Sequence, residues 1–277
     1  MTVRHAVVAG QFYPQQPEML EKDVRSYMDA SGVVASPSQV AALVVPHAGY
    51  VYSGPTAGFA YARVRGAEPK RVVLLGRSHR YAFRGASIWP SGGYESPLGI
   101  LPVDVNMAAI LAQEFGSGAP EEAHETEHTL EVQAPFVQVA IGTVPIVPVL
   151  FGDEAGEWHV EFGRMLALFL EPGDLVIAST DLSHYLTEPQ AESIDNESTG
   201  TILDRDPAQL ARRLATGACS MCGGAAVVAA MAYANARCAV DWHLLDYRTS
   251  AHASGDTGHV VGYSAISMEY DEEGSEQ

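Results

Sequence analysis

The chain has 277 residues, of which 47% are hydrophobic and 18% charged, an ordinary mixture for a globular protein. Its formal net charge of −18 argues against nucleic acid or an anionic membrane surface as partner, because both bind through a basic face. No run of about 18 apolar residues is present to span a bilayer, and the N-terminus lacks the apolar core of a signal peptide.

The first predicted elements are two strands separated by a helix. Residues 41–46 (AALVVP) and 71–76 (RVVLLG) are continuous apolar runs, the pattern of strands buried on both faces. Between them a helix is predicted from Gly54-Pro55, since proline suits the first position of a helix. Short strands near an edge of the sheet are predicted at residues 88–89 and 100–103.

A helix is predicted next at residues 104–115, with Asp104 as its N-cap and Gly116 as its stop. Residues 127–139 also have a helical pattern, although Pro135 should kink that helix or restart it. Residues 144–150 (VPIVPVL) predict a strand despite two prolines, at a place where some backbone donors are not needed.

The last third of the chain repeats this alternation. A helix at residues 157–170 ends before Pro172-Gly173, and residues 174–180 (DLVIAST) predict a third clean buried strand. Helices are then predicted at 193–204, 207–215 and 221–235, and closing strands at 240–247 and 259–268. This order predicts one α/β domain over residues 1–270, with a largely parallel or mixed central sheet covered by helices on both faces, and an acidic tail at residues 271–277.

Histidines follow the ends of the three clearest strands. In open α/β sheets, ligands bind beyond the carboxyl ends of the strands, where the loops converge. His47 follows the first strand, His79 follows the second, and Asp181 and His184 follow the third. Each histidine alone is explained as well by a capped turn, but together they indicate a ligand site at one edge of the sheet.

Neutral imidazole binds zinc, copper and iron, and it needs a neighbouring group that fixes which ring nitrogen carries the proton. Asp181, Glu127 and Glu131 are the carboxylates placed to supply that group. The sequence therefore predicts a metal site in which carboxylates orient the histidines.

The three cysteines differ in their surroundings. Cys219 and Cys222 form a CxxC spacing, which is typical of zinc or of a dithiol redox pair but is weak without a second pair of ligands. Cys222 precedes Gly223-Gly224 and an apolar helix, so it is the better candidate for a metal ligand, whereas Cys238 is expected to be a buried small hydrophobe. An odd number of cysteines without a secretion signal favours free thiols in a reducing, cytoplasmic compartment.

His124 and His128 lie four residues apart in HETEHTLE, a spacing that puts two imidazoles on one helix face in zinc proteases. That interpretation is disfavoured, because the segment follows a loop rich in glycine and proline and its first histidine can precede the helix. Glycine-rich phosphate loops and the GxSxG motif of hydrolases are also absent from the sequence.

Several segments taken together resemble the Memo-like proteins, a family also called AmmeMemoRadiSam system protein B. The matching segments are AVVAGQFYP, VPHAGYVYSG, LLGRSHR, EHTLEVQAPFVQ, PIVPVLFG, STDLSHY, the CGG that begins at Cys222, and GYSAI. They run in order from residue 6 to residue 266, so the resemblance covers nearly the whole chain.

The resemblance implies a fold similar to the class III extradiol dioxygenases, which use iron to open catechol rings. It implies a metal pocket made by His47, His79 and Cys222. It also implies a catalytic or orienting role for His184 with Asp181 beside it. His128, Tyr50 and Tyr52 are expected near the pocket, the two tyrosines as cofactor-binding residues.

The third ligand departs from those dioxygenases, which bind iron through two histidines and a carboxylate. A thiolate at Cys222 is softer and favours copper(I) or zinc more than a carboxylate does. The expected function is a metal-dependent redox protein, dioxygenase-like, with Fe(II) or copper and a small-molecule substrate. The alternatives are a non-catalytic protein that binds a peptide or partner, and a zinc hydrolase. The family name also implies a radical SAM protein and an AMMECR-type protein as partners.

Overall fold

Four parallel strands form the centre of the computed structural model, which describes residues 3–115 and 120–271. They lie in the order β2 (Val40–Val45), β8 (Leu175–Ser179), β3 (Val72–Arg77) and β7 (Ile146–Phe151). Every residue in them is buried except Arg77, as expected for strands covered on both faces. The α/β prediction is confirmed, and each of the four apolar runs is a strand within about two residues of the predicted bounds.

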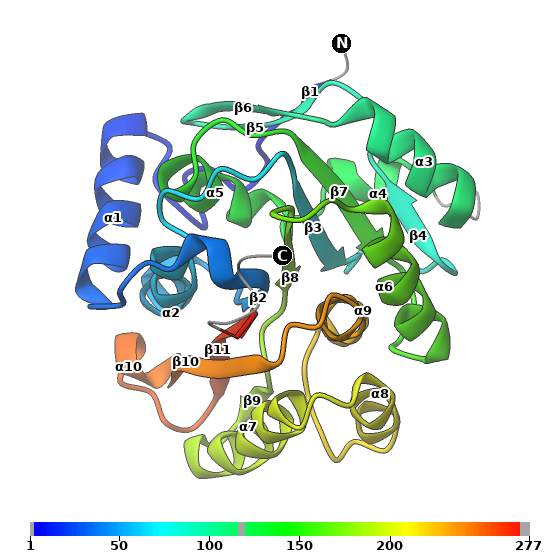
Figure 1. Cartoon of the computed structure of the whole chain (residues 1–277). Coiled ribbons are helices and arrows are strands. Elements are labelled where there is room, and N and C mark those ends of the chain that lie inside the picture. The colour runs from blue at the N-terminus through cyan, green and yellow to red at the C-terminus, as the bar shows by residue number, and fades with distance from the viewer. Residues whose placement is uncertain (1–2, 116–119, 272–277) are drawn as a thin grey trace.

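Antiparallel strands extend this sheet at both ends, so the sheet is mixed (Figure 1). On one side, β11 (Val260–Glu269) pairs with β2, and β10 (Asp241–Thr249) pairs with β11. The short strand β9 (His184–Leu186) also pairs with β11. On the other side, β4 (Ala86–Ile88) pairs with β7. A separate three-stranded sheet holds β1 (Val3–Arg4), β5 (Gly93–Ser96) and β6 (Gly99–Pro102).

Helices cover both faces of the central sheet (Figure 1). On one face α9 (Gly224–Ala236) packs on β2, β8 and β3, with α6 (Glu157–Phe169) outside it; on the other are α2 (Tyr50–Arg63), α1 (Pro17–Ala30) and α5 (Ala134–Ala140). The remaining helices are α3 (Val105–Phe115), α4 (Glu122–Glu125), α7 (Glu188–Leu203), α8 (Pro207–Ala215) and α10 (Ala251–Ser254), with 3-10 turns at Pro37–Gln39 and Glu131–Gln133.

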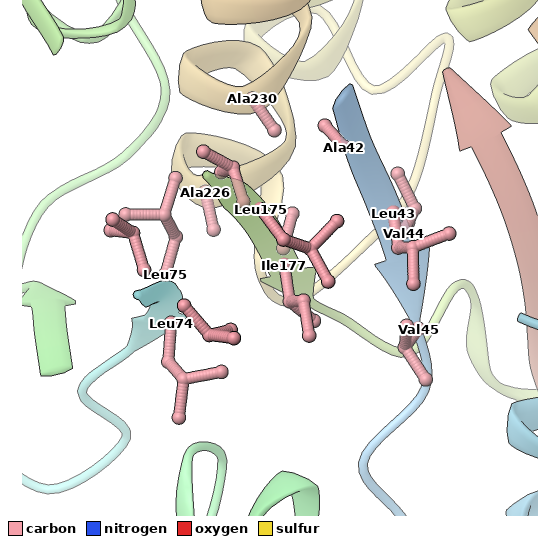
Figure 2. Close-up of a cluster of buried hydrophobic side chains, with 14 of the residues drawn as sticks. Ala42, Leu43, Val44, Val45, Leu74, Leu75, Leu175, Ile177, Ala226 and Ala230 are labelled. Atoms are coloured by element: carbon pink, nitrogen blue, oxygen red, sulfur yellow. The ribbon is translucent and has the colours of Figure 1, made fainter. Parts of the chain in front are cut away.

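Small side chains let α9 approach the sheet and α6 closely. Ala226 and Ala230 of α9 lie against the apolar side chains of β3 and β8, as Figure 2 shows. A Cβ atom added to Gly163 of α6 would stand 2.1 Å from the carbonyl oxygen of Ala229. This close packing fixes the start of α9 beside the carboxyl ends of the strands, where Cys222 lies.

Three helix predictions were wrong in their bounds. α7 begins at Glu188, before the predicted start at residue 193, because Pro189 stands in its first turn. α2 begins at Tyr50 instead of Gly54-Pro55, because the carbonyl of Gly49 already accepts bonds from the backbone nitrogens of Tyr52 and Ser53. Residues 127–139 are not one helix: a 3-10 turn comes first, and Pro135 stands in the first turn of α5, so the proline restarts the helix.

Several elements were absent from the prediction: α1 and β5, and the short elements β1, α4, β9 and α10. α1 buries Leu20, Val24 and Met28 at four-residue intervals, a helical signal that the sequence does contain. β5 lies in a segment that has the composition of a turn. Asp104 is confirmed as an N-cap, since its carboxylate accepts from the backbone nitrogen of Met107 at 3.0 Å, whereas Gly116 and most of the acidic tail lie outside the described residues.

Within the described part of the chain, no helix has both the length and the apolar character needed to cross a membrane.

Candidate metal centre

Three predicted ligands meet at the carboxyl edge of the parallel strands. His47 follows β2, His79 follows β3, and Cys222 lies just before α9. One ligand atom of each lies within 4.8 Å of one ligand atom of both others, and Cys222 Sγ is 3.1 Å from His47 Nε2. The sheet therefore brings together residues that are up to 175 positions apart in the sequence.

The hydrogen bonds of Ser179 fix the tautomer of His47. The Ser179 hydroxyl donates its one hydrogen to the carbonyl of Thr129 at 2.7 Å, so it can only accept from His47 Nδ1, which is 3.0 Å away. Nδ1 therefore carries the proton, and Nε2 presents its lone pair towards Cys222. Asp181 supports the same residue by accepting from the backbone nitrogen of His47 at 2.7 Å.

Glu127 orients His79 in the same way. Its buried carboxylate accepts from the backbone nitrogen of His79 at 2.6 Å and from His79 Nδ1 at 3.2 Å. Burial lowers the pKa of His79, but hydrogen bonds with Cys222 and Glu127 outweigh that effect and raise the pKa to about 9. Any metal that binds here must displace that proton from His79.

The same carboxylate also holds His128. It accepts from the backbone nitrogen of His128 at 2.8 Å and lies 3.1 Å from His128 Nδ1. Burial alone would raise the pKa of Glu127, but the bonds from His128 and His79 lower it well below its usual range. The ligand atoms of His79, Glu127 and His128 are close enough together to hold a second metal ion. However, the carboxylate of Glu127 already accepts hydrogen bonds from the N–H groups of both histidines, so these three residues form a hydrogen-bonded cluster.

Three imidazoles consequently face one another. The ring centroid of His128 lies 5.4 Å from that of His47 and 5.1 Å from that of His79. Because Nδ1 of His128 faces Glu127, its Nε2 is left without a partner among the described residues. The prediction that His128 lies near the pocket matches this geometry.

The loop that carries Cys222 packs directly on the end of β8. Cys222 Sγ accepts from the backbone nitrogen of Asp181 at 3.3 Å, and Gly223 donates from its backbone to the hydroxyl of Thr180 at 2.8 Å. A Cβ atom on Gly223 would lie 2.3 Å from the carbonyl oxygen of Ser179, so only glycine permits this approach.

Comparison with known proteins agrees with the arrangement of these segments. The family model described as "Memo-like protein" matches residues 4–267. The chain belongs to the Memo-like family. A "MEMO1 family protein" of Thermotoga petrophila is 36% identical over 95% of this chain and 99% of its own length, and one of Nitrosopumilus maritimus is 31% identical over 95% and 98%.

A solved structure with a similar fold is that of an uncharacterized protein from Escherichia coli K12. It covers 82% of this Memo-like chain and 99% of its own, with a TM-score of 0.55 and 15% sequence identity. At that identity the likeness supports the fold alone.

The structure separates the other two cysteines of the Memo-like chain from the centre. Cys219 is buried, with its thiol against the hydroxyl of Thr201 at 3.5 Å and the carbonyl of Glu197 at 3.7 Å, both on α7. Cys238 is exposed with a φ of 58°, so the expectation that it is a buried hydrophobe was wrong. All three thiols are free.

The expected pairing of Asp181 with His184 is not observed. Asp181 bonds to the backbone of His47, and its Oδ2 lies 4.0 Å from His47 Nε2. His184 lies half-buried on β9, where its ring contacts Tyr185 and makes no hydrogen bond within the described residues. The reason is that Asp181 lies at the start of the loop after β8, whereas His184 already belongs to β9 and pairs with β11.

The two predicted tyrosines point in different directions. Tyr50 is buried and donates its hydroxyl to the carbonyl of Val132 at 2.6 Å, so it lies in the core instead of at the histidines. Tyr52 is 41% exposed and lines a cavity beside β11. Residues two apart on a helix lie on different faces, which accounts for the contrast.

His124 and Glu131 have structural partners. His124 donates from Nε2 to the carbonyl of Ser87 at 3.0 Å, so its Nδ1 accepts from the Tyr94 hydroxyl at 2.5 Å and neither nitrogen is left for a metal. The sequence offered Glu131 as a carboxylate that could orient a histidine, but it does not do so. Its carboxylate pairs with Arg4 and accepts a hydrogen bond from the hydroxyl of Tyr13.

Sequence reasoning also missed Ser179 and Gln133, which anchor His47 from within the fold. Gln133 donates from Nε2 to the hydroxyl of Ser179 at 2.9 Å and to the carbonyl of Pro46 at 3.0 Å. Both are buried polar residues, and a serine inside the apolar run DLVIAST is the signal that marks the first of them.

Proposed function

We propose that this Memo-like protein binds one redox-active metal ion, iron or copper, through His47, His79 and Cys222, and that it oxidises a small organic molecule in a dioxygenase-like reaction. The observation that carries the proposal is the convergence of two imidazoles and one thiol within 4.8 Å of one another. Each imidazole has its Nδ1 held by a buried acceptor, Ser179 or Glu127. Imidazoles whose second nitrogen is fixed in this way are typical of metal ligands.

The donor set fits such an ion. Two imidazole nitrogens and a thiolate suit copper and iron, and they suit zinc as well. Three protein ligands leave a position for a substrate, as expected of a catalytic rather than a structural site. When bound, the metal would supply electron transfer and polarisation of a bound oxygen atom.

The residues around the ligands are proposed to hold and move protons. His128 presents an unpartnered Nε2 beside both histidine ligands, so it is the nearest base available to a substrate proton. His184, at the edge of the site, is proposed as a second proton carrier, and Asp181 is proposed to position His47. Ser179 and Glu127 keep the imidazoles in one tautomer throughout.

A second candidate function is the binding of a protein or peptide without catalysis. Exposed large side chains follow each of the three histidines closely in sequence: Val51 (65% exposed) and Tyr52 (41%) begin α2, Tyr81 (40%) lies after β3, and Tyr185 (75%) lies on β9. Exposed large apolar side chains near a site favour a docking surface. The radical SAM and AMMECR-type proteins that the family name implies are the proposed occupants, in a cytoplasmic setting consistent with three free thiols.

Metal analysis of the protein purified without oxygen tests the leading proposal. We expect about one equivalent of iron or copper per chain and, after oxidation to Fe(III) or Cu(II), a visible thiolate-to-metal charge-transfer band. Both should be lost in Cys222→Ser, and both should remain in Cys219→Ser, the matched control. One equivalent of zinc with no redox-active metal would favour the hydrolase, and equal metal in both variants would refute the ligand assignment.

A further inference from the structure

A cavity of about 380 Å³ lies between the start of α2 and the turn that joins α10 to β11. Its lining includes Tyr52 of α2, Ser254 of α10, Asp256 and His259 of the turn, and Tyr263 of β11. Its size falls within the range of small-molecule sites. No role has so far been assigned to it.

Tyr263 is a buried residue whose hydroxyl keeps contact with the open space of this cavity. The residue is 2% exposed, and its hydroxyl has no hydrogen-bond partner among the described residues. Burial is the main reason why the pKa of Tyr263 is raised, with Asp181 and Tyr52 adding to the effect, so its hydroxyl remains a neutral donor at physiological pH. A hydroxyl in this position is available to water or to a ligand that enters the cavity.

Tyr263 also connects the cavity to the metal centre. The residue before it, Gly262, bonds to the loop after β8 twice: its carbonyl accepts from Leu182 at 2.8 Å, and its nitrogen donates to Ser183 at 3.0 Å. Asp181, which supports His47, begins that loop. The strand that carries Tyr263 is therefore bonded to the same loop as the residue that supports His47.

The residues that line the cavity favour a positively charged ligand. Asp256 contributes a carboxylate, of which Oδ1 accepts from the backbone of Gly258 at 2.8 Å, and the two tyrosines contribute aromatic rings. No lysine or arginine lines the cavity in the described part of the chain, and the whole chain carries a net charge of −18. Carboxylates and aromatic rings together attract an ammonium group, and an acidic protein concentrates cations near its surface.

We propose that this cavity binds a small organic amine, with the ammonium group at Asp256 and the rest of the molecule extending past Tyr52 to the hydroxyl of Tyr263. Its role as the substrate of the metal centre rests on the proposed function, whereas the preference of the cavity for an amine does not. The proposal of an amine site and the proposal of a metal site can therefore be tested separately.

Three probes of similar shape and different charge test the amine preference: phenethylamine, 2-phenylethanol and 3-phenylpropanoate. Binding is followed by ligand-observed NMR and calorimetry on the metal-free and the metal-loaded protein. We expect phenethylamine to bind at least about tenfold more tightly than the neutral and anionic probes in both forms. Equal binding of the three, or preference for the acid, would overturn the proposal.

Variants locate the site. Asp256→Asn should weaken phenethylamine binding by about five- to tenfold and Tyr263→Phe by about threefold to fivefold, because each removes one polar contact. The matched controls are Asp204→Asn, an exposed residue at the end of α7, and Tyr27→Phe on α1, both expected to bind like wild type. Wild-type affinity in both cavity variants would place the amine elsewhere and refute the assignment.

The substrate role has its own readout. If the bound amine reaches the centre, phenethylamine should shift the charge-transfer band of the metal-loaded wild type, and Asp256→Asn should require more probe for the same shift. A bound metal with no spectral response to bound amine would refute the substrate role. Amine selectivity in a protein that takes up no metal would support the cavity and refute the proposed function instead.

Discussion

Glu127 and Glu131 lie four residues apart in one segment, and both carboxylates are buried, yet they stabilise different parts of the molecule. Glu127 accepts from the backbone and side chain of His79 and His128. Glu131 pairs with Arg4, whose side chain is 1% exposed, and accepts from the backbone nitrogens of Val7 and Val8. The partners, and neither burial nor residue type, separate the carboxylate beside the proposed metal ligands from the structural one.

Arg4 bonds to this segment at several points besides the carboxylate of Glu131. Arg4 also donates to the carbonyls of His124 and Glu127, so it ties the N-terminal strand to the start of the segment that holds the histidines. A buried charge of this kind is stable only while all of its bonds are made. Substitutions at the two positions should consequently have different effects, one on folding and the other on the centre.

The largest effect is expected from Glu131→Gln. It removes the charge that compensates buried Arg4, so the free energy of unfolding should fall by about 3–5 kcal/mol in urea titrations. Glu21→Gln on α1 is the matched control, since its pair with Arg25 is exposed and such a pair contributes less than about 1 kcal/mol. A loss at Glu131 as small as that of the control would contradict a structural role for the pair.

Glu127→Gln should affect the centre more than the fold. The Nδ1 atoms of His79 and His128 both face Oε1 of Glu127, and glutamine would offer them a neutral and weaker acceptor, so neither imidazole would be held as firmly with a proton on Nδ1. We expect metal affinity to fall by about 10- to 100-fold, measured by competition with a chelator. The folded fraction of the Glu131→Gln variant should keep the metal affinity of the wild type. An equal loss of metal affinity in the two variants would contradict the different roles of the two carboxylates.

The buried His124 should make the free energy of unfolding depend on pH. Burial lowers the pKa of His124 to about 3, and the bond to Ser87 only partly offsets that effect. The unfolded chain takes up this proton near pH 6.5 and the folded chain does not, so the contribution is present above pH 6.5 and is lost as pH falls towards 3.

Between pH 7 and pH 5 this histidine should therefore reduce the free energy of unfolding by about 2 kcal/mol. His124→Asn removes the titration, so its stability should fall by about 2 kcal/mol less than that of wild type over the same range. His5→Asn, at an exposed position, serves as the control. Parallel stability curves for wild type and His124→Asn would show that His124 does not carry this dependence.

The fold was predictable where one local pattern decides it. The four parallel strands are buried on both faces, so each is a continuous apolar run that needs no knowledge of its neighbours. The loops after two of them then place His47 and His79 at one edge. β5, by contrast, has the composition of a turn and becomes a strand only through pairing with β1 and β6.

The surroundings of the site were less predictable, because they depend on contacts between distant residues. Nothing near Glu131 in the sequence indicates that its partner is Arg4, 127 residues away. In the same way, Asp181 is adjacent in sequence to the segment of His184, but its carboxylate bonds to His47, 134 residues away. The resemblance to the family supplied the three converging residues, and the structure supplied the groups that orient them.

The smallest effect is expected from Ser179→Ala. Ser179 joins His47 to Thr129, so the segment that orients His79 through Glu127 also orients His47 through this hydroxyl. Without it, His47 Nδ1 loses its acceptor, and metal affinity should fall by about threefold to tenfold, as for the loss of one hydrogen bond. Nitrogen-15 NMR of the metal-free protein should show His47 as a single Nδ1–H tautomer in wild type and as a mixture in the variant. Ser267→Ala, which removes a buried hydroxyl that has no partner, is the control and should change neither quantity. An unchanged tautomer in Ser179→Ala would mean that Cys222 or another group at the centre orients His47, and that the two histidine ligands are not held by one common segment.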